Sequence, residues 1–210
     1  MWEMMNLYEQ SLRVPLLVRP APHDRRFADI VSVYDHPVEL LDLLPTMATL
    51  AGLPPPPAEW QLPGSDLSRG MIANEVVKPI NAAFGQITRC VNCTMAYSFS
   101  SGLAACTKDH VADAALYLTP CAETQRDMFD WMGMSVRTSH WRYSVFCRWD
   151  GVALQANFSS CAPPELYNHS SDRSLFDVDS NGEQENLAGN AEVEEQEREL
   201  RAKLMERFHA

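Results

Sequence analysis

Two β-patterned runs that lie three residues apart constrain the fold of this chain more than any other feature. Residues 132–137 and 141–147 are rich in apolar and aromatic side chains, and only the polar residues Thr138, Ser139 and His140 separate them. So short a gap joins antiparallel strands, because parallel neighbours need a crossover of a dozen residues or more. The pattern therefore predicts an antiparallel hairpin, and residues 165–167 predict a short third strand.

The end of the chain predicts an amphipathic helix that docks on this sheet. Asn190 can cap its start. An apolar stripe of Val193, Leu200, Leu204 and Phe208 marks the face that packs. On the other face, acidic and basic residues four positions apart stand in the favourable order, each pair contributing about 0.2–0.5 kcal/mol. These pairs are Glu194–Arg198, Glu197–Arg201 and Glu199–Lys203.

The first third of the chain predicts elements of a different kind. Val14–Val18 is a short, continuous apolar run, which is typical of a buried strand in a parallel sheet. Residues 30–34 are a second strand candidate. A helix with a wide apolar face should follow, with Pro37 at its first position, a kink or break at Pro45 and its end at Gly52.

The middle of the chain is partly legible. Four prolines, Pro54 to Pro57, predict a stiff extended linker, and residues 80–88 predict a strand. Residues 90–130 are irregular and contain four of the six cysteines. No element is predicted there.

Charge and hydropathy exclude some classes of partner. The net charge of −11 argues against binding to nucleic acid or to anionic membranes. No stretch approaches the roughly 20 apolar residues that a membrane-spanning helix needs. The first residues have neither the basic region nor the apolar region of a secretory signal, so no signal peptide is predicted.

The cysteines and glycosylation sequons nevertheless indicate an oxidising compartment. Three sequons begin at Asn92, Asn157 and Asn168. An even number of cysteines, absent from the first 89 residues, is typical of disulfides, although six cysteines allow 15 pairings. The disulfide candidates are Cys90, Cys93, Cys106, Cys121, Cys147 and Cys161. The sequons and cysteines are typical of a secreted protein, yet no signal peptide is predicted. Both observations would be explained if the sequence began in mid-protein.

Part of the cysteine pattern also fits zinc. Cys90, Cys93, Cys106 and His110 have the spacing of a single zinc finger with a cysteine as third ligand. Lys108 is the only base in that segment, so DNA contact is not expected, and the sequon at Asn92 favours disulfides over zinc. The other histidines show no partner pattern and are expected in loops or on the surface.

Three arginines lie on or beside the predicted hairpin. Arg137, Arg142 and Arg148 could line the rim of a cleft for an acidic sugar. The alternative interpretation is that they are solvated charges on the strands.

A series of segments resembles, in the family's order, the characteristic blocks of sulfatases, closest to the iduronate-2-sulfatase branch. The first runs from Trp2 to Leu16 and resembles W-x-K-M followed by E-x-[SA]-x-R-V-P-L, and the second, Val38–Leu53, is similar to VELVDIFPTL…LAGL. Residues 83–89 (AFGQITR) resemble A-[FY]-S-Q-[YF]-P-R, and residues 132–145 resemble MGYSIRT..YRYTVW. The remaining blocks are residues 64–67, 155–159, 165–167 and 185–188.

This resemblance implies an α/β fold in two parts. Residues 1–55 would be the last strand and helix of a large mixed-sheet sulfatase domain, and residues 56–79 a linker. Residues 80–210 would form a small α+β C-terminal subdomain, an antiparallel sheet with a C-terminal helix, with a cysteine-rich insertion at 90–130. The implied location is lysosomal or extracellular.

The resemblance also implies chemistry that needs residues outside this sequence. In the family a cysteine in C-x-[PA]-S-R becomes formylglycine, and calcium held by Asp and Asn oxygens polarises the sulfate. No cysteine here fits that motif; the nearest, Cys161, is followed by Pro164 and Glu165 where Ser and Arg are required. The family's sulfate-contacting lysine corresponds to Met4, which cannot donate a charged hydrogen bond.

We therefore expect no catalytic residue, no metal ligand and no bound cofactor in this chain, which alone should be inactive. It would be a fragment or a truncated gene model of an enzyme that takes sulfated sugars or small sulfate esters, and the missing N-terminal part would be its partner. The alternatives are a non-catalytic secreted module stabilised by disulfides and a small zinc-binding module.

Overall fold

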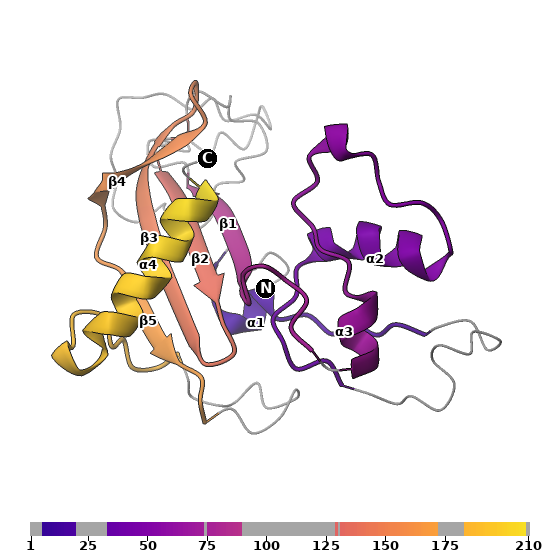
Figure 1. Ribbon diagram of the computed structural model, residues 1–210. Coiled ribbons are helices and arrows are strands. Elements are labelled where there is room, and N and C mark those ends of the chain that lie inside the picture. The colour runs from indigo at the N-terminus through magenta and orange to yellow at the C-terminus, as the bar shows by residue number, and fades with distance from the viewer. Residues whose placement is uncertain are drawn as a thin grey trace, which may run out of the picture.

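The computed structural model describes residues 6–19, 33–73, 75–89, 129, 131–171 and 183–208. These residues form a mixed α/β structure that contains one antiparallel sheet, a C-terminal helix on one face of the sheet and a smaller helical lobe beside it (Figure 1). The fold class predicted for the C-terminal part of the chain, an antiparallel sheet with a helix at its end, is confirmed.

The sheet has five strands: β1 (Ala83–Arg89), β2 (Trp131–Arg137), β3 (Trp141–Asp150), β4 (Gln155–Cys161) and β5 (Glu165–Asn168). The first four lie side by side in chain order, and β5 pairs with the start of β3. The hairpin of β2 and β3 and the third strand, β5, are confirmed. The strand β4 was not predicted, because only Ala156 and Phe158 in it are buried and its other residues read as polar loop.

Helix α4 (Glu194–Phe208) covers one face of the sheet, preceded by the 3-10 turn η6 (Ala191–Val193). The side-chain oxygen of Asn190 accepts a hydrogen bond from the Glu192 amide at 2.9 Å, which confirms the predicted cap. Leu200 and Leu204 are buried, and Val193 and Phe208 pack against the same core, so the apolar stripe packs on the sheet as expected. The core beneath them consists of Met132, Met134, Val136, Tyr143, Val145, Cys147, Ala156, Phe158 and Leu166.

The predicted i,i+4 ion pairs on α4 do not form. Arg198 pairs with Glu195, three residues away, and Arg201 donates to the carbonyl oxygen of Phe158 at 2.9 Å. The Glu197 carboxylate accepts a hydrogen bond from the Gly189 amide at 2.9 Å. The charged side chains of α4 therefore bond to neighbouring segments as well as to one another within the helix.

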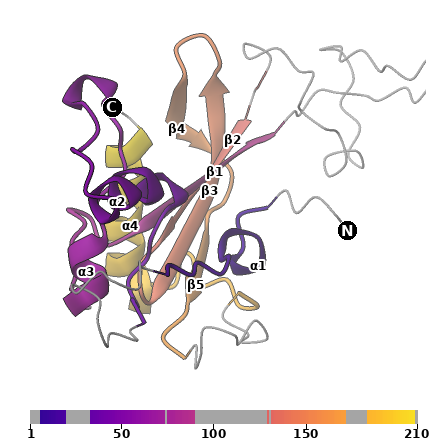
Figure 2. The same cartoon turned by 90° about the vertical axis from the view of Figure 1, so that its right-hand side faces the viewer.

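The opposite face of the sheet is covered by the short helix α1 (Glu9–Leu12) and the residues before it (Figure 2). Leu7 is buried there, and a Cβ added to Gly85 of β1 would lie 3.0 Å from the Leu12 side chain. Glycine at this position leaves room for α1. The sheet is thus packed on both faces by segments from opposite ends of the chain.

The buried strand predicted for Val14–Val18 is wrong in this structure. These residues have no strand partner, and Leu17 is 93% exposed. A strand of a parallel sheet needs neighbours, and no strand in the described part of the chain lies beside this run. The second candidate, residues 30–34, is described only at Val33 and Tyr34, which are not in a strand.

The smaller lobe contains η2 (Leu40–Asp42), α2 (Leu43–Leu50), η3 (Ala58–Trp60) and α3 (Ser68–Ala73). The first helix begins at Leu40 rather than at Pro37, because the Asp42 carboxylate accepts the Glu39 amide at 2.8 Å and caps the chain there. Pro45 does not break α2, because it lies in the first turn, where an amide hydrogen has no helical partner.

Gly52 ends α2, as predicted. Its φ of 69° is left-handed, and its amide bonds to the Thr49 carbonyl at 3.1 Å while the Leu53 amide bonds to that of Ala48 at 2.9 Å. This pair of bonds is the Schellman arrangement that satisfies the last carbonyls of a helix.

The apolar face of this helical segment is exposed, contrary to the prediction of a well-buried helix. Leu40 is 69% exposed, and the exposed residues also include, with smaller exposed fractions, Leu41, Leu44, Met47 and Leu53. Their spacing predicts a buried face, but no described part of the chain covers it.

A buried ion cluster holds the lobe together and links it to α4. The Asp42 carboxylate is fully buried and accepts the amide of Ser65 and the ammonium of Lys78, at 2.8 and 3.2 Å. Lys78 also contacts Glu39 at 2.9 Å, and the other oxygen of Glu39 lies 3.9 Å from Arg207 of α4.

Within the described residues, no helix has both the length and the apolar character required to cross a membrane.

One disulfide lies in the described part of the chain, between Cys147 of β3 and Cys161 of β4. These two disulfide candidates are therefore joined. Cys90, Cys93, Cys106 and Cys121 lie outside the described residues, as do His110 and the rest of the zinc spacing.

We expect this disulfide to stabilise the sheet. The bond closes a loop with a sequence separation of 14, and closing a loop of that size removes unfolded-state entropy equivalent to about 3 kcal/mol. The double variant Cys147→Ser/Cys161→Ser should lower the free energy of unfolding by about that amount in a urea titration. An unchanged urea midpoint would show that the bond contributes nothing.

Candidate functional site

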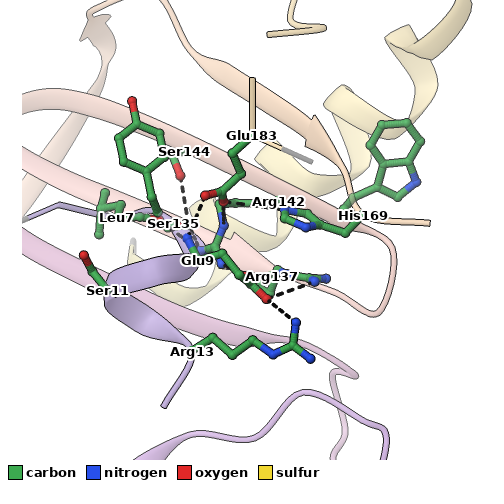
Figure 3. A network of polar contacts seen from close by, with 12 residues as sticks. Leu7, Glu9, Ser11, Arg13, Ser135, Arg137, Arg142, Ser144, His169 and Glu183 are labelled. Atoms are coloured by element: carbon green, nitrogen blue, oxygen red, sulfur yellow. Dashed lines mark hydrogen bonds and ion pairs between the residues drawn. The ribbon is translucent and has the colours of Figure 1, made fainter. Parts of the chain in front are cut away.

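The most unusual feature of the described residues is a buried cluster of charges on the α1 side of the sheet (Figure 3). Arg137 is the last residue of β2 and Arg142 is the second residue of β3, and the two are directly paired across the hairpin. Like charges at such positions destabilise a sheet unless an anion lies between them. Glu9 of α1 supplies that anion.

The Glu9 carboxylate bridges the arginines. Arg137 donates from Nε and Nη2 to its two oxygens at 3.0 and 3.2 Å, and Arg142 donates to one of the same oxygens. Arg13, one turn further along α1, contacts the carboxylate at 3.3 Å. A bidentate contact of this kind fixes the orientation of the carboxylate and also compensates its charge.

A second carboxylate, Glu183, completes the cluster from a distant part of the sequence. Its Oε1 lies 2.5 Å from Nε of Arg142 and 3.5 Å from Nε2 of His169, and its Oε2 accepts the backbone amide of Glu9 at 2.8 Å. Four chain segments therefore meet at these side chains: α1, the β2–β3 hairpin, the loop after β5 and the stretch before α4.

Arg142 is the centre of the cluster, and its side chain is 1% exposed. Besides the two carboxylates, its Nη1 donates to the Leu7 carbonyl at 3.0 Å and approaches the Ser135 hydroxyl at 3.3 Å. Ser144 donates to the same hydroxyl at 2.9 Å. Burying a guanidinium is costly unless it is paired and hydrogen-bonded, and here it is both.

The electrostatics of Glu9 follow from these contacts. Burial by itself would raise the pKa of this carboxyl, but the hydrogen bond and charge of Arg137, together with the charges of Arg142 and His169, lower its pKa to about 2. Glu9 therefore stays ionised at any physiological pH.

Beside the cluster, the Tyr8 hydroxyl donates a hydrogen bond to Glu165 at 3.0 Å. Burial, and after it the charge of Glu165, raises the pKa of the Tyr8 phenol.

The cluster does not fit a metal ion. Glu9, His169 and Glu183 are the described residues whose ligand atoms come within 4.8 Å of one another. Calcium requires six to eight oxygen ligands, and a cation here would have to displace the guanidinium of Arg142 from both carboxylates. The calcium that the sulfatase resemblance implies is therefore not assigned to these residues.

The structure places the other predicted residues apart from this cluster. Met4 and Asn92 lie outside the described residues, whereas Asn157 and Asn168 are exposed on β4 and β5. Arg148 lies at the far end of the hairpin, 4.4 Å above the ring of Trp131. The three hairpin arginines therefore do not line one cleft.

The sequence interpretation missed most of the cluster. Arg142 is neither a solvated charge nor a cleft residue, because its side chain is buried. His169 lies in the loop after β5, as expected, but it is buried at 4% exposure. Glu9 and Glu183 were not singled out. The available signal was the pairing of two arginines at facing positions of a predicted hairpin, which requires a nearby anion.

Comparison with known proteins adds little to this geometry. No protein-family model and no curated protein matches the chain. Among solved structures, it is similar to the phosphonate monoester hydrolase SpPMH from Silicibacter pomeroyi, with 15% sequence identity and a TM-score of 0.43 over 82% of this chain. The chain spans 25% of the length of that protein.

The cluster should give the protein a defined acid sensitivity. The folded-state pKa of Glu9 lies near 2 and its ordinary value is 4.5, so its contribution is complete above pH 4.5 and is lost as pH falls toward 2. Glu9→Gln should cost about 3 kcal/mol of unfolding free energy at pH 7, because it removes the buried carboxylate that bridges Arg137 and Arg142. Urea unfolding at pH 7 and pH 3 measures both effects.

The matched control is Glu195→Gln, which removes a carboxylate from an exposed pair on α4 and should change stability by less than about 0.5 kcal/mol. The variant Glu9→Gln should also show a flatter loss of stability between pH 4.5 and pH 2 than the wild type. Parallel pH curves for Glu9→Gln and the wild type would contradict the assignment.

Proposed function

We propose that this chain is the C-terminal portion of a sulfatase-type hydrolase of the iduronate-2-sulfatase branch. The intact enzyme would hydrolyse sulfate esters of the glycosaminoglycan type. The chain itself would supply the small subdomain and the end of the large domain, and it would not carry out the reaction alone.

The observation that carries this proposal is the ordered series of sequence blocks. The block at residues 38–53 falls on η2 and α2 and includes the left-handed Gly52 that ends α2. The block at 83–89 is β1, and the blocks at 132–145 form the hairpin of β2 and β3. Residues 155–159 and 165–167 fall in β4 and β5, and residues 185–188 lie just before η6 and α4. These blocks therefore fall on or beside regular elements of the fold, which supports the proposal, whereas Val14, Pro15 and Leu16 of the first block form no strand.

The exposed apolar surface of the smaller lobe also supports the proposal. Val14, Leu16 and Leu17 are exposed on an extended segment, and Leu40, Leu41 and Leu44 are exposed on η2 and α2. Exposed apolar patches of this kind usually mark contact with another body of protein. In the proposed enzyme this body is the remainder of the large catalytic domain, which would provide strand neighbours for Val14–Val18.

The buried charge cluster around Arg142 would then hold α1 on the sheet and would take no part in catalysis. Its carboxylates are already paired with guanidinium groups, and the hydroxyls beside them, of Ser135 and Ser144, are buried and hydrogen-bonded to each other. Formylglycine and the calcium that polarises the sulfate would belong to the catalytic domain. The subdomain would hold the segment that begins with the Met4 block in its place beside that site.

The proposed location is lysosomal or extracellular. Asn157 and Asn168 are exposed, and each side chain accepts the backbone amide two residues ahead, at 3.0 and 2.8 Å. The Cys147–Cys161 disulfide favours an oxidising compartment as well. The same disulfide keeps open the alternative of a secreted, non-catalytic module. Finding C-x-P-S-R and an Asp-His pair in frame before Met1 would exclude that module.

The isolated chain should show no calcium-dependent hydrolysis of 4-methylumbelliferyl sulfate. The chain contains no C-x-[PA]-S-R sequence, so no formylglycine can form on it. Fluorescence from the released methylumbelliferone, measured with and without calcium, tests this expectation. Turnover that depends on calcium would overturn it.

The intact protein gives the complementary test through Met4. If Met4 occupies the position of the sulfate-contacting lysine, Met4→Lys should raise kcat/KM for the same substrate, because a charged donor to a developing anion is worth about 10²-fold or more. Arg19→Lys, a substitution away from that block, is the control and should leave kcat/KM unchanged. An intact protein that lacks sulfatase activity in both forms would reject the proposed function.

A further inference from the structure

Two of the three glycosylation sequons lie in the described part of the chain, along the same edge of the sheet. Asn157 is the third residue of β4, and Asn168 is the last residue of β5. Because β4 pairs with the end of β3 and β5 pairs with its start, both asparagines lie on the same side of that strand. Both residues are exposed, but the chain restrains the two sites in different ways.

The site at Asn157 lies inside a covalently closed loop. The disulfide between Cys147 and Cys161 encloses the whole sequon, residues 157–159. Within the sequon, Asn157 belongs to the ladder with β3 and Phe158 is buried. Local unfolding breaks hydrogen bonds and apolar contacts, but it leaves a disulfide intact. Once this bond has formed, the backbone of the sequon stays close to β3.

The site at Asn168 lies outside that loop, where β5 ends and a turn begins. Its Oδ1 accepts the backbone amide of Ser170 at 2.8 Å, and its Nδ2 donates no hydrogen bond within the described part of the chain. The middle residue, His169, is buried, but its side chain lies 3.5 Å from Glu183, which joins the growing chain later. Only noncovalent contacts therefore restrain this sequon, and they are incomplete during synthesis.

We propose that Asn168 is the main acceptor of an N-linked glycan in the described part of this chain, and that the Cys147–Cys161 disulfide limits modification of Asn157. The donor would be an oligosaccharide carried on a lipid diphosphate. Nδ2 of Asn168 forms a bond to the first carbon of the sugar, and the bond from that carbon to the diphosphate oxygen breaks. The lipid diphosphate leaves, and the amide loses one proton to a base of the transferase. So bulky a group needs a surface position, which Asn168 has.

The full chain, directed into the secretory pathway of cultured cells by an added signal peptide, tests the proposal. A peptide N-glycosidase in water enriched in heavy oxygen converts each glycosylated asparagine to labelled aspartate, and a glutamate-specific protease separates the two sequons at Glu165. Mass spectrometry should find Asn168 modified in most molecules and Asn157 in at least about twofold fewer. An unmodified Asn168, or equal occupancy of the two sites, would overturn the proposal. Neither result bears on the proposed sulfatase function.

The role of the disulfide is tested by the variant Cys147→Ser/Cys161→Ser, with occupancy measured on the total cellular protein so that secretion does not select molecules. Occupancy of Asn157 should rise at least about twofold, while that of Asn168 stays as in the wild type. Glu9→Gln is the control, because it weakens the docking of α1 and leaves the disulfide in place, so both occupancies should be unchanged. An Asn157 occupancy that is the same without the disulfide, or that rises equally in Glu9→Gln, would contradict the assigned role.

Discussion

The structure depends on one interaction, the carboxylate of Glu9 between two arginines of the hairpin. Arg137 and Arg142 face each other across β2 and β3, an arrangement that repels without an anion between them. Glu9 lies in α1. Arg137 and Arg142, which donate hydrogen bonds to it, lie 128 and 133 residues further along the chain. Glu183, which binds both Arg142 and the Glu9 amide, ties in the segment before α4. Three regions far apart in sequence are fixed by a few side chains.

The two faces of the sheet are stabilised in different ways. Under α4 the packing is apolar, with Met134, Val136 and Leu204 fully buried. Under α1 the centre of the packing is a buried guanidinium surrounded by two carboxylates and a carbonyl. Such a cluster contributes little over a well-packed apolar core, but removing one member leaves an uncompensated charge. It therefore specifies where α1 docks more than it adds to stability.

This contrast explains what could be predicted from the sequence. The hairpin, β5 and the docked helix α4 follow from local patterns: a three-residue gap, an apolar stripe and an asparagine cap. The burial of Arg142 does not, because it depends on partners that no local pattern connects to it. The run Val14–Val18 and the helix α2 have the patterns of buried elements, yet Val14, Leu16, Leu17 and Leu44 are exposed. Under the proposed function, these patterns would belong to a larger domain that covers them. The strand β4 does not follow from the sequence, because it buries only two side chains.

The central claim is that Glu9 and Arg142 act as a unit that holds α1 on the sheet. A double-mutant cycle with Glu9→Gln, Arg142→Met and the combined variant, followed by urea unfolding at pH 7, tests it most directly. The account predicts a coupling free energy of about 2 kcal/mol, with the double variant more stable than the sum of the single losses implies. Losses that add to within about 0.5 kcal/mol would show that the two residues act independently and would contradict the claim.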